Sequence, residues 1–148
     1  AAAPRSPYRH LELCGIAFVF KTTPVNAKHV EGEGKMRITE LFNIQSIALD
    51  SAAADQAQII DELVELQATH GNLTDKAAYK AAIYAREAEA STYVDNGITV
   101  PHARAACVTR PSLAALRLKA PVQYNADDDG KTDLLFMIAA PAAIAANT

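Results

Sequence analysis

The 148-residue sequence contains no tryptophan, only two cysteines and no long hydrophobic run. Two cysteines are too few for a disulfide framework, so Cys14 and Cys107 predict free thiols, which are typical of a reducing cytoplasm. The apolar stretch at residues 13–20 is much shorter than the roughly 20 residues that a helix needs to span a bilayer. It also lacks a clear small-residue cleavage site, which argues against a signal peptide. We therefore expect a cytoplasmic protein.

The chain also lacks a strong excess of charge of either sign. Its net charge of −3 gives no electrostatic reason to expect nucleic acid or an anionic membrane as a partner. His10, His29 and His70 have no metal-ligand spacing with either cysteine, so we predict no metal site. Residues 127–130 lack the alternating ligands and closing glutamate of a calcium loop, and we interpret them as a solvated turn.

The composition is that of one globular domain, because half of the residues are hydrophobic and 21% are charged. Residues 1–35 differ from the rest: proline punctuates their start, and Gly-Glu-Gly-Lys ends them like a linker. We interpret this segment as an N-terminal extension that is poorly ordered or is translated upstream sequence. Met36 would then be the natural start of a domain that comprises residues 36–148.

Residues 36–148 alternate between helical and strand-like patterns. Two helices are predicted, over residues 53–69 and from a cap at Thr74 or Asp75 to Ala90, with Tyr79 and Ile83 facing the core. Short apolar runs predict strands at residues 44–49, 98–100, 113–118 and 134–139, with a turn within 125–130. This alternation indicates an α/β domain with a mixed β-sheet flanked by helices.

The most informative motif is Gly-Ile-Thr-Val-Pro-His-Ala at residues 97–103. Pro101 donates no ladder hydrogen bond, so it suits the end of a strand and would hold His102 there on stiff backbone. Gly97 suits a chain reversal just before this run. Arg86-Glu87 and Ser91-Thr92 precede the motif at a short distance.

Residues 86–103 resemble the active-site motif of the fructose/mannitol-type IIA domains of the bacterial sugar phosphotransferase system, and the likeness extends over residues 36–148. The resemblance implies that the phosphocarrier protein HPr phosphorylates His102. His102 would then pass the group to a IIB domain, which phosphorylates a sugar at a IIC membrane channel. No cofactor is implied, and fructose is the preferred sugar. Asp95 and Thr99 depart from the usual pattern, and Asp95 would repel an incoming phosphate.

This chemistry suits the residue types present. Neutral imidazole is a nitrogen nucleophile near pH 7, and the phosphorus–nitrogen bond is labile enough for a relay. The Arg86 guanidinium matches phosphate oxygens bidentately, and Thr92 and Ser91 offer hydroxyl hydrogen bonds. Glu87 is expected to support the site through an ion pair. Cys107, five residues after His102, is interpreted as an inert, partly buried thiol.

Two alternatives stay open at this level. One is a regulatory IIA protein of the nitrogen-related branch, which acts through partner binding that depends on phosphorylation. The other is a non-enzymatic interaction domain on the same fold, as in the cytoplasmic part of anion exchangers, although Pro101-His102 with Arg86 argues against it. The resemblance also implies that C-terminal helices, beginning with a second functional histidine, are missing after residue 148. Such a fragment is expected to be marginally stable and a poor phosphoryl donor.

Overall fold

The computed structural model describes residues 8–13, 16–21 and 36–142, and the chain divides into two compact units, Ala1–Lys35 and Met36–Thr148. In the first unit, β1 (Tyr8–Leu13) and β2 (Ile16–Lys21) pair as an antiparallel hairpin. The sequence predicts no regular element there, so the hairpin is a difference from expectation. The rest of residues 1–35, the linker included, and residues 143–148 lie outside the described residues.

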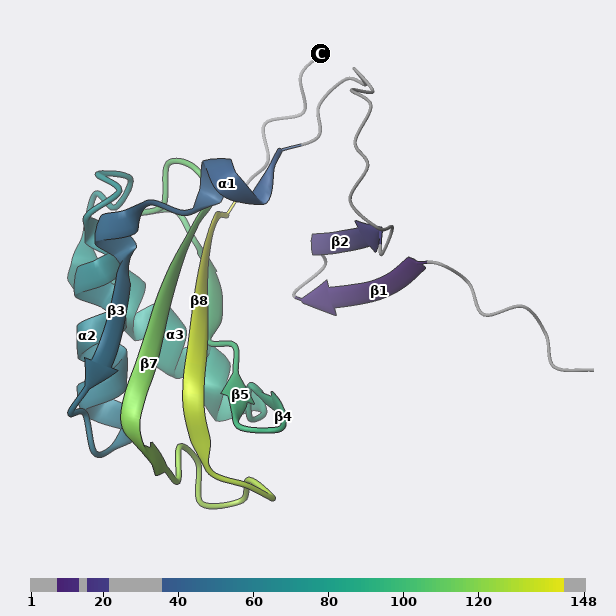
Figure 1. The fold of residues 1–148 in the computed structure, drawn as a ribbon. Coiled ribbons are helices and arrows are strands. Elements are labelled where there is room, and N and C mark those ends of the chain that lie inside the picture. The colour runs from purple at the N-terminus through teal and green to yellow at the C-terminus, as the bar shows by residue number, and fades with distance from the viewer. Residues whose placement is uncertain (1–7, 14–15, 22–35, 143–148) are drawn as a thin grey trace, which may run out of the picture. The chain divides into compact units, whose positions relative to one another are not determined.

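The second unit contains a six-stranded mixed sheet (Figure 1). Its neighbouring strands are β3 (Ile47–Ser51), β7 (Ser112–Val122), β8 (Thr132–Pro141), β5 (Ile98–Thr99) and β4 (Tyr93–Asp95). The sixth strand, β6 (His102–Ala105), also pairs with β8, farther along than β5. β7 and β8 are antiparallel, whereas β3–β7, β5–β8 and β6–β8 are parallel pairs. β5 and β6 therefore follow one another along the same edge of β8, separated by Val100 and Pro101.

Two helices, α2 (Gln56–Ala68) and α3 (Lys76–Glu89), cover one face of this sheet (Figure 1). An aspartate caps each helix locally, because the side chain of Asp55 accepts a hydrogen bond from Gln58 N and that of Asp75 from Ala78 N. The apolar sides of both helices and alternate residues of β7 and β8 form the core, in which Tyr79 and Ile83 are fully buried, as predicted. A short helix, α1 (Ile38–Leu41), precedes the sheet.

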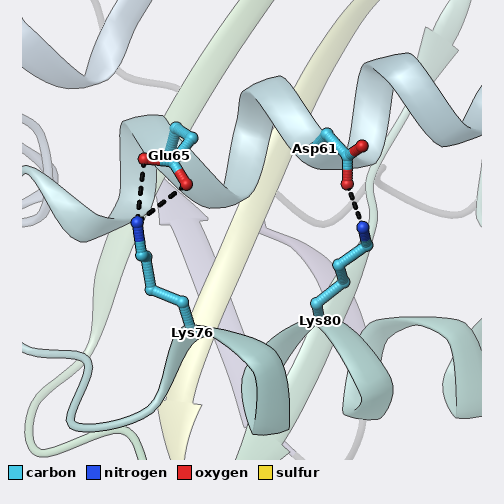
Figure 2. A network of polar contacts seen from close by, with 4 residues as sticks. All are labelled: Asp61, Glu65, Lys76 and Lys80. Carbon is cyan, nitrogen blue, oxygen red and sulfur yellow. Dashed lines mark hydrogen bonds and ion pairs between the residues drawn. The ribbon is translucent and has the colours of Figure 1, made fainter.

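Ion pairs link the exposed sides of the two helices (Figure 2). Lys76 of α3 contacts Glu65 of α2 at 2.8 Å, and Lys80 pairs with Asp61 one turn along. The hydrogen bond to Asp61 raises the pKa of Lys80. Since all four side chains are largely exposed, these pairs orient the two helices more than they stabilise the fold.

The predicted class, a mixed sheet flanked by helices, is confirmed, but β4 and β6 were not predicted, and the strand predicted at residues 44–49 starts later than expected. Residues 44–46 form a 3-10 helix, and the strand begins only at Ile47. Asn43 is the reason, because its side chain accepts a hydrogen bond from Gln45 N and its backbone N–H donates to Ser46 Oγ. Over the described residues, no helix is long and apolar enough to cross a membrane.

Candidate functional site

The segment that carries the motif is shaped by a tight hairpin between β4 and β5. Asn96 and Gly97 form its two-residue turn, with φ angles of 51° and 82°. This left-handed pair is the turn that matches the twist of a hairpin, and Asn-Gly is its preferred sequence. A Cβ at residue 97 would lie 2.6 Å from Asp133 Oδ1, so a larger residue would also force the Asp133 side chain to move. The predicted chain reversal at Gly97 is therefore confirmed, and it brings Tyr93 opposite Thr99 and the Thr92 carbonyl beside the Val100 amide.

His102 is the first residue of β6, directly after the interruption at Val100 and Pro101. Its Nδ1 lies 2.8 Å from the carbonyl oxygen of Val100. A carbonyl can only accept, so Nδ1 carries the proton and donates it, and Nε2 of the neutral ring keeps its lone pair. Nε2 is buried and has no hydrogen-bond partner in the described part of the chain. The backbone thus selects one ring nitrogen of His102 as the available nucleophile.

The neighbouring β6 residues anchor this histidine from the other side of the sheet. Ala103 is buried in the core and Ala105 packs against it, and α3 packs against β6. Side chains alternate along a strand, so His102 lies on the sheet face opposite α3. His102 pairs in register with Ile138 of β8, and Ile138 N donates to the Pro101 carbonyl at 2.9 Å. The imidazole is therefore carried by a strand that the core holds on one face and that β8 holds along one edge.

Glu87, at the end of α3, accepts hydrogen bonds from three neutral groups. Thr92 Oγ1 donates to Glu87 Oε1 at 2.5 Å, and the Tyr124 hydroxyl donates to the same oxygen at 3.1 Å. Asn125 Nδ2 lies 3.5 Å from Oε2. No ion pair of Glu87 occurs among the residues described, so the expected cation partner is replaced by hydroxyl and amide donors. This cluster joins α3 to Thr92 and to the loop after β7.

Thr92 also connects this cluster to the histidine through the backbone. Val100 N donates to the Thr92 carbonyl at 3.0 Å, and the Val100 carbonyl in turn accepts from His102 Nδ1. The sequence predicts that the Thr92 hydroxyl contacts phosphate. In the structure the Thr92 hydroxyl donates its hydrogen bond to Glu87. It can therefore donate to a phosphoryl oxygen only after its bond to Glu87 breaks. Ser91 is held in a similar way, because its hydroxyl donates to Asp128.

Among the described residues, no hydrogen bond joins Arg86 to His102. Its Nη1 donates to the Ala90 carbonyl at 3.0 Å, where it satisfies a backbone acceptor at the end of α3. One such bond leaves other N–H groups of the guanidinium free to meet a phosphate. The arrangement is consistent with either a capping or a phosphate-binding role.

Sequence reasoning missed Tyr124 and Asn125, which lie 37 and 38 residues after Glu87. No local pattern pairs them with α3, although the Asn-Ala-Asp-Asp turn that follows Tyr124 marks the place where the chain reverses. Burial and the negative charge of Glu87 both raise the pKa of Tyr124, so its hydroxyl stays protonated as a donor.

The two positions that depart from the usual motif have clear structural roles. Thr99 is fully buried, and its hydroxyl lies 2.6 Å from that of Thr132, so each satisfies the other. Asp95 is exposed in β4, where its carboxylate accepts the Asn96 N–H at 2.7 Å. Cys107 is buried, and the inertness of its thiol stays a prediction. Within the described ranges, no group of three or more potential ligands could hold a metal ion.

Comparison with known proteins places these features in a family. The profile of the family described as "Phosphoenolpyruvate-dependent sugar phosphotransferase system, EIIA 2" matches residues 40–146. The chain is 41% identical over 105 residues to the fructose-specific EIIABC component of Bacillus subtilis, covering 71% of this chain and 16% of the relative. It is 35% identical over 106 residues to the fructose-specific EIIA component of Haloferax volcanii, covering 72% of this chain and 69% of the relative. The chain thus spans about one sixth of the first relative's length.

Solved structures show the same fold. The nitrogen regulatory protein IIA-Ntr from Neisseria meningitidis matches with a TM-score of 0.66 and 26% identity, covering 72% of each chain. IIA mannitol from Escherichia coli matches with a TM-score of 0.59 and 23% identity, covering 68% of this chain and 72% of the other, a likeness of fold alone. From the family match over residues 40–146, the chain belongs to the EIIA 2 family of the phosphoenolpyruvate-dependent sugar phosphotransferase system.

Proposed function

We propose that the protein is a phosphoryl-relay domain that accepts a phosphoryl group on Nε2 of His102. The observation that carries the proposal is the hydrogen bond from His102 Nδ1 to the Val100 carbonyl, which leaves the lone pair on Nε2. In the transfer, the bond between phosphorus and the donor atom breaks as the Nε2–phosphorus bond forms. The Nδ1 proton stays on the ring, and the Val100 carbonyl stabilises the positive charge that develops there.

The other predicted residues have supporting roles in this proposal. Arg86 supplies positive charge to the phosphoryl oxygens through the N–H groups that Ala90 does not use. Thr92 exchanges its bond to Glu87 for one to a phosphoryl oxygen, while Glu87 keeps Tyr124 as a donor. Because His102 is only 4% exposed, the donor reaches Nε2 after a local opening of the surrounding side chains.

The proposed donor is phospho-HPr and the proposed acceptor is a IIB domain, in a cytoplasmic relay for the uptake of fructose. The two fructose-specific relatives, at 41% and 35% identity, support the choice of sugar. The first of them bears the name of an EIIABC component, which supports a IIB domain as the acceptor. No cofactor is required, since positioning and positive charge are the main demands of phosphoryl transfer.

A regulatory IIA protein is the second candidate, and the fold shared with IIA-Ntr at 26% identity supports it. Both functions use a phosphorylated His102, and they differ in the next step. Transfer from the phosphorylated chain to a fructose-type IIB domain would support the relay. Stable phosphorylation without that transfer would favour regulation through partner binding.

The first experiment asks whether His102 is the acceptor. The chain is incubated with labelled phosphoenolpyruvate, the general phosphotransferase enzyme and HPr. We expect His102→Ala to abolish labelling, because the variant lacks the Nε2 lone pair that the Val100 carbonyl leaves available in the wild type. The matched control is His70→Gln, which removes a histidine whose Nε2 lies 2.8 Å from the Leu113 carbonyl. Labelling of His102→Ala at the wild-type level would contradict the proposal.

A further inference from the structure

Arg104 lies two residues after His102 on the same strand. β6 pairs with β8 so that His102 is opposite Ile138 and Arg104 is opposite Ala140. The intervening Ala103 is buried in the core. Since side chains alternate along a strand, His102 and Arg104 lie on the same sheet face, opposite α3.

Arg104 is exposed, and no hydrogen bond or ion pair of its guanidinium occurs within residues 36–142. Three other arginines of this unit are engaged, whereas Arg37 contributes only its backbone N–H to a hydrogen bond with Glu40. Arg86 donates to the Ala90 carbonyl, Arg110 to the His70 carbonyl at 2.7 Å, and Arg117 to Asp50 at 2.7 Å. Arg104 is therefore a cation beside the candidate nucleophile. Its guanidinium N–H groups are left available for a ligand.

The geometry suits the capture of a phosphoryl group. Residues two apart on a strand have Cα atoms about 6.5 Å apart, a separation that an extended arginine side chain can span. A planar guanidinium binds two phosphoryl oxygens through parallel hydrogen bonds, which also fixes their orientation. Because the strand is anchored through Ala103 and Ala105, the two Cα atoms keep this separation.

We propose that Arg104 is a catalytic residue that binds the phosphoryl oxygens during transfer to and from His102. This inference rests on the proposed phosphorylation of His102. It gives the site a cation from β6 itself, in addition to Arg86 at the end of α3. Removal of Arg104 weakens binding of the transferring group, and a lysine in its place keeps the charge but loses the bidentate contact.

The test uses potassium phosphoramidate, a small phosphoryl donor that needs no partner protein. Attack by Nε2 of His102 breaks the phosphorus–nitrogen bond of phosphoramidate, forms the Nε2–phosphorus bond and releases ammonia. Phosphorylation of the full 148-residue chain is followed by ³¹P NMR and intact-protein mass at several donor concentrations. This yields the apparent saturation constant and the limiting rate separately.

The variants are Arg104→Gln and Arg104→Lys, with Arg117→Gln as the matched control. Arg117 is an exposed arginine on β7, outside the proposed site, and circular dichroism verifies that each variant is folded. We expect Arg104→Gln to lower the second-order rate constant by about tenfold or more. Arg104→Lys should recover part of the loss, and Arg117→Gln should react like the wild type.

The possible outcomes separate this inference from the proposed function. If the wild type is phosphorylated on His102 and Arg104→Gln reacts equally fast, the role of Arg104 is refuted and the relay proposal stands. If the wild type is not phosphorylated, or if His102→Ala is phosphorylated as readily, both proposals fail. A loss in Arg104→Lys as large as in Arg104→Gln supports a contact that depends on the bidentate guanidinium.

Discussion

The Thr92 hydroxyl donates a 2.5 Å hydrogen bond to Oε1 of Glu87, five residues earlier in the chain. This bond joins the end of α3 to the segment that enters the β4–β5 hairpin. From there, the Thr92 carbonyl holds the Val100 amide and the Val100 carbonyl holds His102 Nδ1. The Thr92–Glu87 pair is thus the first link of a hydrogen-bonded connection that ends at the candidate nucleophile.

A double-mutant cycle on this pair should show coupling. Thr92→Val removes the donor at nearly constant volume, and Glu87→Gln removes the charge of the acceptor. Each change should lower the free energy of unfolding by about 1 kcal/mol, and the double variant should lose less than the sum. Urea denaturation measures all four proteins, and Glu89→Gln, on the exposed side of α3, serves as the control. Strict additivity would show that the two side chains do not stabilise one another.

Arg86→Lys should slow phosphorylation of His102 and leave the fold intact. Lysine keeps the positive charge but loses the fork that positions phosphoryl oxygens. The rate is measured with labelled phosphoenolpyruvate, the general enzyme and HPr, and the thermal unfolding midpoint is measured in parallel. A wild-type rate with a lowered midpoint would assign Arg86 to capping α3 through the Ala90 carbonyl instead.

Stability should fall steeply at alkaline pH because two tyrosines are buried. Burial raises the pKa of Tyr79 and of Tyr124 above the ordinary value of 10.0. Above pH 10 the unfolded chain releases these phenolic protons and the folded protein retains them, so the free energy of unfolding decreases as pH rises. Below pH 10 both states are protonated, and the two groups add no pH dependence.

Tyr79→Phe should make this alkaline decrease shallower. Without the Tyr79 hydroxyl, one fewer proton is released when the chain unfolds above pH 10. Urea denaturation at several pH values, from about two units below to about one unit above the ordinary tyrosine pKa, checks the slope. Tyr93→Phe is the control, because Tyr93 is only half-buried. An unchanged slope in Tyr79→Phe would mean that this hydroxyl does not govern alkaline unfolding.

Deletion of residues 1–35 should leave the unfolding of the second unit nearly unchanged. The chain divides into compact units at Lys35 and Met36, and the family match begins at residue 40. The thermal midpoint of a chain that starts at Met36 is compared with that of residues 1–148. A fall of several degrees would show that the N-terminal unit contributes to the stability of the domain.

Local interactions explain why much of the fold was predictable. The aspartate caps at Asp55 and Asp75, the periodic apolar faces of α2 and α3, and the Asn96-Gly97 turn all involve residues a few positions apart. The helices, the α/β class and the candidate nucleophile therefore followed from the sequence and its resemblance. The 3-10 helix at 44–46 was missed because the side chains of Asn43 and Ser46 outweighed the β-branched character of that run.

The sequence by itself determined that a histidine would follow a strand and a proline, because proline and β-branched residues restrict their own backbone. Only the tertiary structure decided which nitrogen of His102 is free, since that depends on the path of the Val100 carbonyl. It also decided that Glu87 meets Thr92 and Tyr124 in place of a cation, and that Arg104 shares a face with His102. The contact between Glu87 and Tyr124 joins residues 37 positions apart, and the others depend on where the strands begin and end, which packing of the whole domain sets.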